Sequence, residues 1–148
     1  MDGAMIERLL KSDPKCRDVF LGTFPRDRLP KTLSKPSLMI CNTDPHDQPG
    51  QHWIVIYFRD VEYGEYFDSF GRLPERTFQI YLNKHCRNWI FNDRQLQSLI
   101  SRFCGHYCVL YCVKRCRGMD IVAITNMFTE DTAVNDYMAH AFVCNHYR

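Results

Sequence analysis

The chain has 148 residues, a formal net charge of +2, 45% hydrophobic residues and 24% charged residues. This composition is that of a globular protein and excludes a low-complexity or repeat chain. No apolar run is long enough to span a bilayer. No linker divides the chain, so we expect one domain over residues 1–148 that buries about two-thirds of its unfolded surface.

Residues 1–11 carry charges within an apolar pattern, which predicts a short amphipathic helix rather than a signal peptide. Short apolar runs and turn residues predict strands and turns, in chain order: strands at 37–41, 53–58, 66–68 and 89–92, a turn at 47–50 and a reversal at 63–65. Helical patterns follow at 74–86, 105–113 and 119–128, with a last helix beginning near 129–132. These elements predict an α+β fold with a central mixed or antiparallel sheet and helices on both sides.

Cys104 is the candidate nucleophile. A free thiol is mostly protonated at neutral pH, so a nucleophilic cysteine needs an imidazolium or a helix N-terminus beside it. The apolar segment 105–113 predicts a buried helix that begins at Cys104 and ends near Gly118. Its dipole favours a thiolate there, and Gly105 has no side chain to obstruct a substrate carbonyl. Taken alone, Cys104 is more typical of a buried structural thiol.

His52 and Asp68 lie at the ends of two predicted strands. His52 precedes the run 53–58, and Asp68 ends the next apolar run. Two adjacent antiparallel strands bring both side chains to one edge of a sheet, where a carboxylate can hold the imidazole tautomer. Asp68 alone is more typical of a turn or a cap.

Gln97 is the candidate oxyanion donor. Its side-chain amide lies 7 residues before Cys104 and can act together with the Cys104 backbone N–H. Surface glutamines are common, and Gln95 is a rival for this position. The residues alone therefore leave the choice between Gln97 and Gln95 open.

These clusters and their order resemble the adenovirus-type cysteine endopeptidases, the adenain family, and relatives in Polinton/Maverick elements and related DNA viruses. The matching motifs are His52-Trp53, Asp68-Ser69-Phe70-Gly71, Gln97 and Cys104-Gly105, together with residues 20–24, 41–43 and 51–53. The resemblance spans nearly the whole chain and implies the papain-like fold of adenain. It assigns a general base, an orienting acid, an oxyanion donor and a nucleophile, in this order: His52, Asp68, Gln97 and Cys104. Adenain has a glutamate in place of Asp68, whereas related peptidases use aspartate.

The resemblance implies a thiol endopeptidase that cleaves protein precursors near glycine, encoded by a virus or a mobile element. It implies an intracellular enzyme of the host nucleus or the virion, with no metal, no organic cofactor and no membrane partner. Proteases of ubiquitin-like modifiers share the order of the four residues and remain an alternative. A non-catalytic binding module that retains the fold is a third interpretation, which the intact set of four residues disfavours.

The eight cysteines predict free thiols, because the N-terminal residues do not form a signal peptide and the compartment is then reducing. Half of them recur every four residues and would form one stripe on a helix: Cys104, Cys108, Cys112 and Cys116. Such a stripe extends over about 18 Å, too far for its sulfurs to surround one metal ion. We expect these thiols to pack the helix.

Two further features bear on activation. Cys86 lies 18 residues before Cys104, the spacing at which adenain carries the cysteine that joins its activating peptide by a disulfide. The resemblance thus implies a peptide activator at Cys86, although a buried thiol at the end of helix 74–86 is the simpler interpretation.

Basic residues form two clusters: Arg26, Arg28, Lys31 and Lys35, then Lys114, Arg115 and Arg117. Because adenain uses DNA as a cofactor, the resemblance implies a phosphate-binding face, while scattered basic residues more often only solvate a surface.

Overall fold

The computed structural model describes residues 1–48 and 52–147, and its centre is a five-stranded sheet in the order β1-β2-β3-β4-β5. The strands are β1 (Phe20–Pro25), β2 (Ser37–Asn42), β3 (Trp53–Phe58), β4 (Tyr63–Phe67) and β5 (Asn88–Phe91). The inner pairs β2–β3 and β3–β4 are antiparallel, and the outer pairs β1–β2 and β4–β5 are parallel. The sheet is therefore mixed, and β3 lies at its middle.

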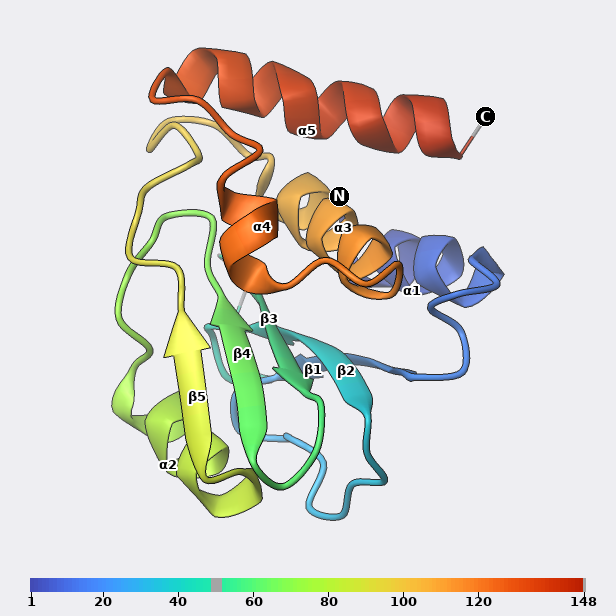
Figure 1. Cartoon of the computed structure of the whole chain (residues 1–148), viewed down its shortest axis with the longest axis vertical. Helices are drawn as coiled ribbons and strands as arrows, with labels where there is room; N and C mark the ends of the chain where they lie inside the picture. The colour runs from blue at the N-terminus through green and yellow to red at the C-terminus, as the bar shows by residue number, and fades with distance from the viewer. Residues whose placement is uncertain (49–51, 148) are drawn as a thin grey trace.

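Five helices cover the two faces of this sheet (Figure 1). They are α1 (Gly3–Ser12), α2 (Arg76–His85), α3 (Cys104–Arg115), α4 (Ile121–Thr125) and α5 (Thr132–His146). Successive strand residues point to opposite faces, so Val55 joins the core formed with α1, α3, α4 and α5, whereas Ile54 joins the core with Phe78 of α2. The predicted α+β fold with helices on both sides is confirmed. No helix of the described residues is long and apolar enough to cross a membrane.

Helix α3 is the central helix of the larger core. Its sequence is apolar on every side, and residues 107–113 are accordingly all buried. Glu65 of β4 is fully buried and ties this helix to the sheet, since its carboxylate accepts the Tyr111 hydroxyl and pairs with Arg115. It also accepts the backbone N–H of Ile121 at 3.2 Å, at the start of α4. A buried carboxylate requires such partners, so Glu65 fixes both helices on β4.

Two predicted boundaries are wrong. Residues 63–65 belong to β4 rather than to a reversal, because Asp60 accepts the backbone N–H groups of Glu62 and Tyr63 and closes the turn earlier. The helix predicted at 119–128 is shorter and consists of α4 alone. Asp120 caps its start, because the Asp120 side chain accepts the backbone N–H of Ala123. Residues 49 and 50 of the turn predicted at 47–50 lie outside the described residues.

Gly71 lies in the turn after β4, where the chain approaches the segment before α3. Its φ is +70°, a conformation that favours glycine. A Cβ at this position would lie 2.4 Å from the carbonyl carbon of Arg94, so a side chain is also excluded by contact with backbone. Gly118 has a φ of +96° but would bring a Cβ within 4 Å of nothing. A side chain at Gly118 would therefore meet only an unfavourable φ, whereas a side chain at Gly71 would also clash with the backbone of Arg94.

We predict that Gly71→Ala destabilises the protein more than Gly118→Ala. The Gly118 variant suffers only the left-handed conformation, which costs about 1–2 kcal/mol, whereas the Gly71 variant also forces two backbone segments apart. Urea unfolding of the two variants and the wild type measures the difference in free energy of unfolding. Equal losses for the two variants would contradict the close approach of residues 71 and 94.

Candidate active site

Strands β3 and β4 place His52 and Asp68 side by side. His52 directly precedes β3 and Asp68 directly follows β4, and antiparallel pairing sets Val55 opposite Phe67. Nε2 of His52 lies 2.6 Å from Oδ1 of Asp68, and both side chains are nearly buried. A carboxylate in this position fixes the imidazole tautomer and stabilises its protonated form. Because Nε2 faces the carboxylate, Nδ1 is the nitrogen left for a thiol.

The turn that follows β4 holds both members of this pair. Oδ1 of Asp68 also accepts the backbone N–H of Phe70 at 2.8 Å. Asn92 binds the backbone of Asp68 twice, accepting its N–H at 2.9 Å and donating to its carbonyl at 2.6 Å. The Phe70 ring stacks on the His52 imidazole, with centroids 4.4 Å apart. These contacts orient the imidazole from its edge and from its face.

Cys104 is the first residue of α3, next to His52. Burial by itself raises the pKa of its thiol, but hydrogen bonds with His52 and with the backbone N–H of Trp53 lower that pKa below the ordinary value. Burial by itself lowers the pKa of His52, but Asp68 and Cys104 raise it to about 9. The helix N-terminus adds to the stabilisation of negative charge. The site therefore favours an imidazolium and thiolate ion pair at neutral pH.

Gln97, rather than Gln95, lines the same cavity as Cys104. Gln97 is 1% exposed, and its backbone N–H donates to the Ser69 carbonyl at 2.9 Å. Gln95 is exposed and donates its side-chain amide to the Gln97 carbonyl at 2.9 Å. The structure thus distinguishes the two glutamines that spacing alone left as rivals.

Three of the four predicted residues line one cleft of about 320 Å³: His52, Gln97 and Cys104. The fourth, Asp68, lies behind His52. The cleft is lined by Met1, His52, Trp53, Phe70, Gln97, Ser101, Arg102 and Cys104. The sequence did not identify four of these residues as part of the cleft: Met1, Phe70, Ser101 and Arg102. Only Phe70 had a sequence signal for this position, since it belongs to the motif that contains Asp68.

The predicted role of Gly105 is wrong. It is buried, and a Cβ on this residue would lie 3.1 Å from Cβ of Met1 and 3.6 Å from Cδ1 of Ile6. Glycine at this position therefore makes room for the N-terminal segment beside α3, not for a substrate carbonyl. Met1 reaches the cleft because of this contact.

The other cysteines differ from Cys104 in environment. All eight cysteines are free thiols. Cys108 and Cys112 are fully buried within α3, and burial raises the pKa of each well above its ordinary value. The prediction that these two pack the helix is confirmed. Cys86 caps the end of α2 in the core on the opposite face of the sheet, and burial raises its pKa as well.

No protein-family model matches this chain. It is 30% identical to a protease of Bovine adenovirus 7, over 70% of this chain and 60% of that protein. The solved ASFV pS273R protease is 17% identical with a TM-score of 0.54, over 81% of this chain and 58% of that chain. The central domain of the uncharacterised Lpg1148 protein from Legionella pneumophila is 13% identical with a TM-score of 0.49, over 98% of this chain and 97% of that chain.

The chain spans 60% of the curated adenovirus protease and 58% of the solved ASFV protease. The likeness to the ASFV structure agrees with the adenain-type fold expected from the motifs. It concerns the fold alone, because the sequence identity is low. The roles of the individual site residues rest on the geometry of this chain.

We predict that iodoacetamide alkylates Cys104 at a lower pH than an exposed thiol. Below about pH 9, the pKa of His52, the imidazolium is present and holds the thiolate. His52→Ala removes this positive charge, so the pKa of Cys104 rises and the onset of alkylation moves to higher pH. Mass spectrometry of alkylated peptides across pH measures both onsets.

The exposed Cys144 serves as the comparison within the same sample. Cys104→Ser confirms which peptide carries the label. Equal rates for Cys104 and Cys144 at every pH in the wild type would show that no ion pair forms.

Proposed function

We propose that this chain, which is 30% identical to a protease of Bovine adenovirus 7, is a cysteine endopeptidase that cleaves viral or mobile-element precursor proteins. One observation carries the proposal: Cys104 at the start of a buried helix contacts an imidazole that a carboxylate already holds at 2.6 Å. These are the parts that an activated thiol nucleophile requires. Their opposite pKa shifts are the pattern expected at a catalytic pair.

In the first step, the Cys104 thiolate attacks the scissile carbonyl carbon. The carbonyl oxygen becomes an oxyanion, which needs donors placed before the reaction begins. The first N–H groups of a helix have no partner within it, so the Cys104 N–H is one donor. The Gln97 side-chain amide in the same cleft is the second. Asp68 stabilises the imidazolium of His52 throughout this step.

In the second step, His52 gives its proton to the leaving amine, and the peptide bond breaks to leave a thioester on Cys104. Water then attacks the thioester carbonyl while His52 removes a proton from it. The second tetrahedral intermediate uses the same two donors. Its collapse releases the new carboxyl end and restores the ion pair.

The side chains that line the cleft limit the size of the substrate residues beside the cut. Trp53 and Phe70 bring two aromatic residues to the cavity that holds Cys104 and His52, and Met1 adds a further apolar side chain. A cleft walled by large side chains suits small residues beside the cut. We therefore propose cleavage at glycine-containing sites of capsid or element-encoded precursors, in the host nucleus or the virion.

Cys86 is the proposed site of a peptide activator. Its thiol is 6% exposed and lies 3.5 Å from the carbonyls of Leu82 and Asn88. A cavity of about 650 Å³, which Lys35 and Val61 also line, opens beside it. Because burial raises the pKa of Cys86, exchange with a peptide disulfide is slow unless the end of α2 opens.

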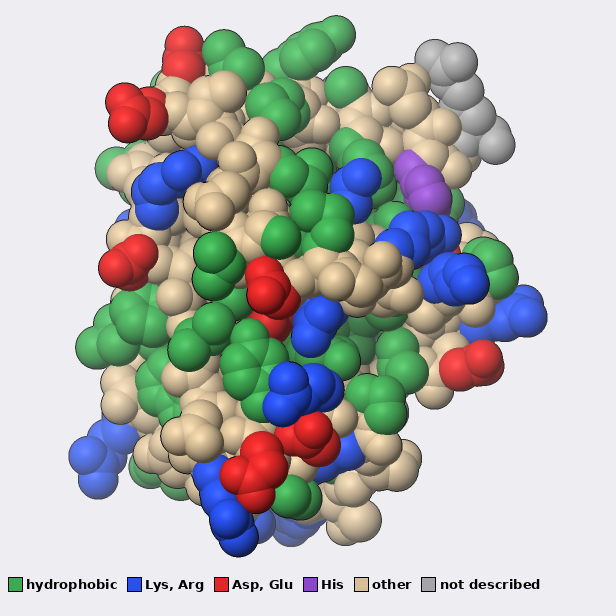
Figure 2. Space-filling model, viewed as in Figure 1, with side chains coloured by type: hydrophobic (Ala, Val, Ile, Leu, Met, Phe, Trp, Pro, Cys, Tyr) green, Lys and Arg blue, Asp and Glu red, His purple; other side chains and the backbone are tan. Residues whose placement is uncertain are grey.

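Duplex DNA is the second proposed activator, and the pairing of the basic residues supports one of the two clusters as its contact. Arg115 pairs with the buried Glu65, Arg117 pairs with Asp13, and Lys114 lies over the Phe142 ring. Figure 2 shows basic side chains distributed among acidic and apolar ones on the face in view. The N-terminal cluster contains two exposed basic residues, Arg28 and Lys31. We therefore place the proposed DNA contact at residues 26–35.

We predict that the protein hydrolyses glycine-containing peptides and that Cys104→Ala reduces kcat/KM by about 10⁴-fold or more, because the nucleophile is lost. Cys144→Ala, which removes an exposed thiol, is the matched control and retains full activity. Peptide-library cleavage followed by mass spectrometry measures both rates and the residues beside the cut. Labelling of Cys104 by ubiquitin or SUMO vinyl sulfone without peptide cleavage would support the modifier-protease alternative. Absence of both reactions in the wild type would support a binding module.

The same assay tests the activators. A panel of cysteine-containing peptides under oxidising conditions is expected to raise the rate in the wild type but not in Cys86→Ser. Short duplex DNA is expected to raise the rate at low salt and lose its effect as salt increases. Activation that is unchanged in Cys86→Ser, or a rate that DNA does not alter at low salt, removes the corresponding proposal.

A further inference from the structure

Ser69 holds Gln97 at both its backbone and its side chain. Ser69 follows Asp68 in the turn after β4 and is 1% exposed. Its hydroxyl donates to Oε1 of Gln97 at 2.6 Å. Its carbonyl accepts the backbone N–H groups of Gln97 and Leu96, each at 2.9 Å. One residue of this turn therefore fixes both the position of Gln97 and the direction of its amide.

The direction of the amide matters because its two ends differ chemically. A glutamine side chain donates through its nitrogen and accepts through its oxygen, so only the nitrogen end serves an oxyanion. On the nitrogen side, Nε2 donates to the carbonyl of Ser101 and to its hydroxyl, each at 3.1 Å, so an oxyanion would replace Ser101 as an acceptor. A carbonyl has no proton to give, so Nε2 is the end that faces Ser101. Ser101 lines the cleft, which places the donor end of Gln97 on the cleft side.

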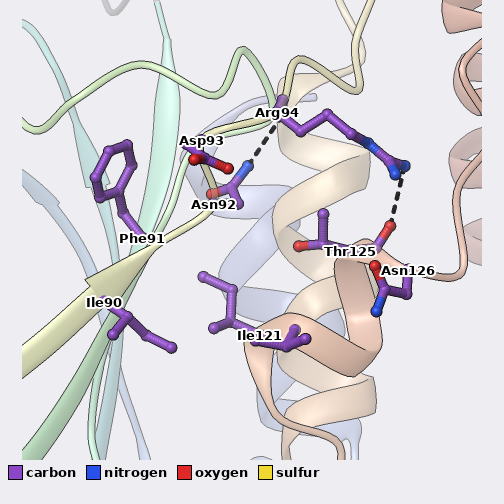
Figure 3. Close-up of a pocket in the computed structure, with 9 residues that line it drawn as sticks. Ile90, Phe91, Asn92, Asp93, Arg94, Ile121, Thr125 and Asn126 are labelled. Atoms are coloured by element: carbon purple, nitrogen blue, oxygen red, sulfur yellow. Dashed lines mark hydrogen bonds between the residues drawn. The ribbon is translucent and has the colours of Figure 1, made fainter.

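The segment that carries Gln97 is anchored at two further residues. Asn92 joins the start of this segment to Asp68 through two hydrogen bonds. Arg94 donates to the carbonyl of Thr125, the last residue of α4, at 3.1 Å. It also donates to the carbonyl of Phe128, beyond α4, at 2.9 Å. Asn92, Arg94 and Thr125 line a cavity of about 200 Å³. Figure 3 shows the Arg94 side chain extending towards Thr125, while Asn92 lies beside the Arg94 backbone.

We propose that Ser69 is a positioning residue for the oxyanion donor: its hydroxyl holds the amide oxygen of Gln97 away from the cleft and so presents the amide N–H to the substrate. This inference rests on the proposed function, because it needs Gln97 to act on an oxyanion. It adds a second task to the turn after β4. Asp68 orients the base, and the adjacent Ser69 orients the donor.

The test compares Ser69→Ala with a matched loss of a buried hydroxyl. Ser37 is fully buried on β2, and its hydroxyl has no hydrogen-bond partner among the described residues, so Ser37→Ala removes the same group far from the cleft. Ser69→Ala is expected to lower kcat about 10- to 100-fold with little change in KM, less than the full loss of one oxyanion donor. Ser37→Ala is expected to retain the wild-type kcat.

Two further readouts separate positioning from a structural role. A peptide aldehyde forms a tetrahedral adduct with Cys104 that carries an oxyanion, so its affinity should fall in proportion to kcat in Ser69→Ala. Alkylation of Cys104 by iodoacetamide forms no oxyanion, so its rate should stay at the wild-type value. In Gln97→Ala, the added Ser69→Ala change should cost nothing more, because the two residues act as one unit.

Ser69→Thr and Ser69→Val form a second pair of equal shape, with and without the hydroxyl. Thr is expected to retain activity and aldehyde affinity, whereas Val is expected to lose both, even if Ser69→Ala fails to fold. Equal behaviour of Thr and Val, or a parallel loss of alkylation and kcat, overturns the inference and leaves the protease function standing. A wild type that neither cleaves peptides nor binds the aldehyde overturns the protease function and the inference with it.

Discussion

The turn at residues 68–71 is the constraint on which the candidate site depends. It contacts His52 through a carboxylate and an aromatic ring, and it contacts Gln97 through Ser69. Gly71 brings the same turn against the backbone of Arg94. His52 and Gln97, the proposed base and oxyanion donor, are therefore positioned by one short segment rather than by each other. A movement of this turn would displace both at once, which couples two separate requirements of catalysis.

Helix α3 shows how one element makes identical side chains behave differently. Cys108 and Cys112 are sealed in the core, where burial raises the pKa and keeps the thiols protonated. Cys104 lies in the same helix but at its first residue, beside His52 and two backbone N–H groups. Position at the helix end therefore distinguishes Cys104, the proposed nucleophile, from Cys108 and Cys112, which pack the core.

The sequence predicts the parts of the site that lie at the ends of regular elements. The run 53–58 is apolar because β3 is buried, so His52 before it is visible as a polar residue at a strand end. Asp68 and Cys104 are visible for the same reason. The contact between Ser69 and Gln97 joins residues 28 positions apart, and tertiary packing alone determines it. Met1 leaves no sequence pattern either, since its place depends on how α1 packs against α3. The strand boundary at Tyr63 was missed because the Asp60 side chain closes the turn earlier than propensity suggests.

The position of Met1 against Gly105 has a practical consequence for handling the protein. Any residue placed before Met1, whether an affinity tag or a scar left by its removal, begins at the wall of the cleft that contains Cys104. Such an extension would compete with a substrate for the same space. No residue of α5 or after it is among the described residues that line that cleft. Purification tags therefore belong at the C-terminal end.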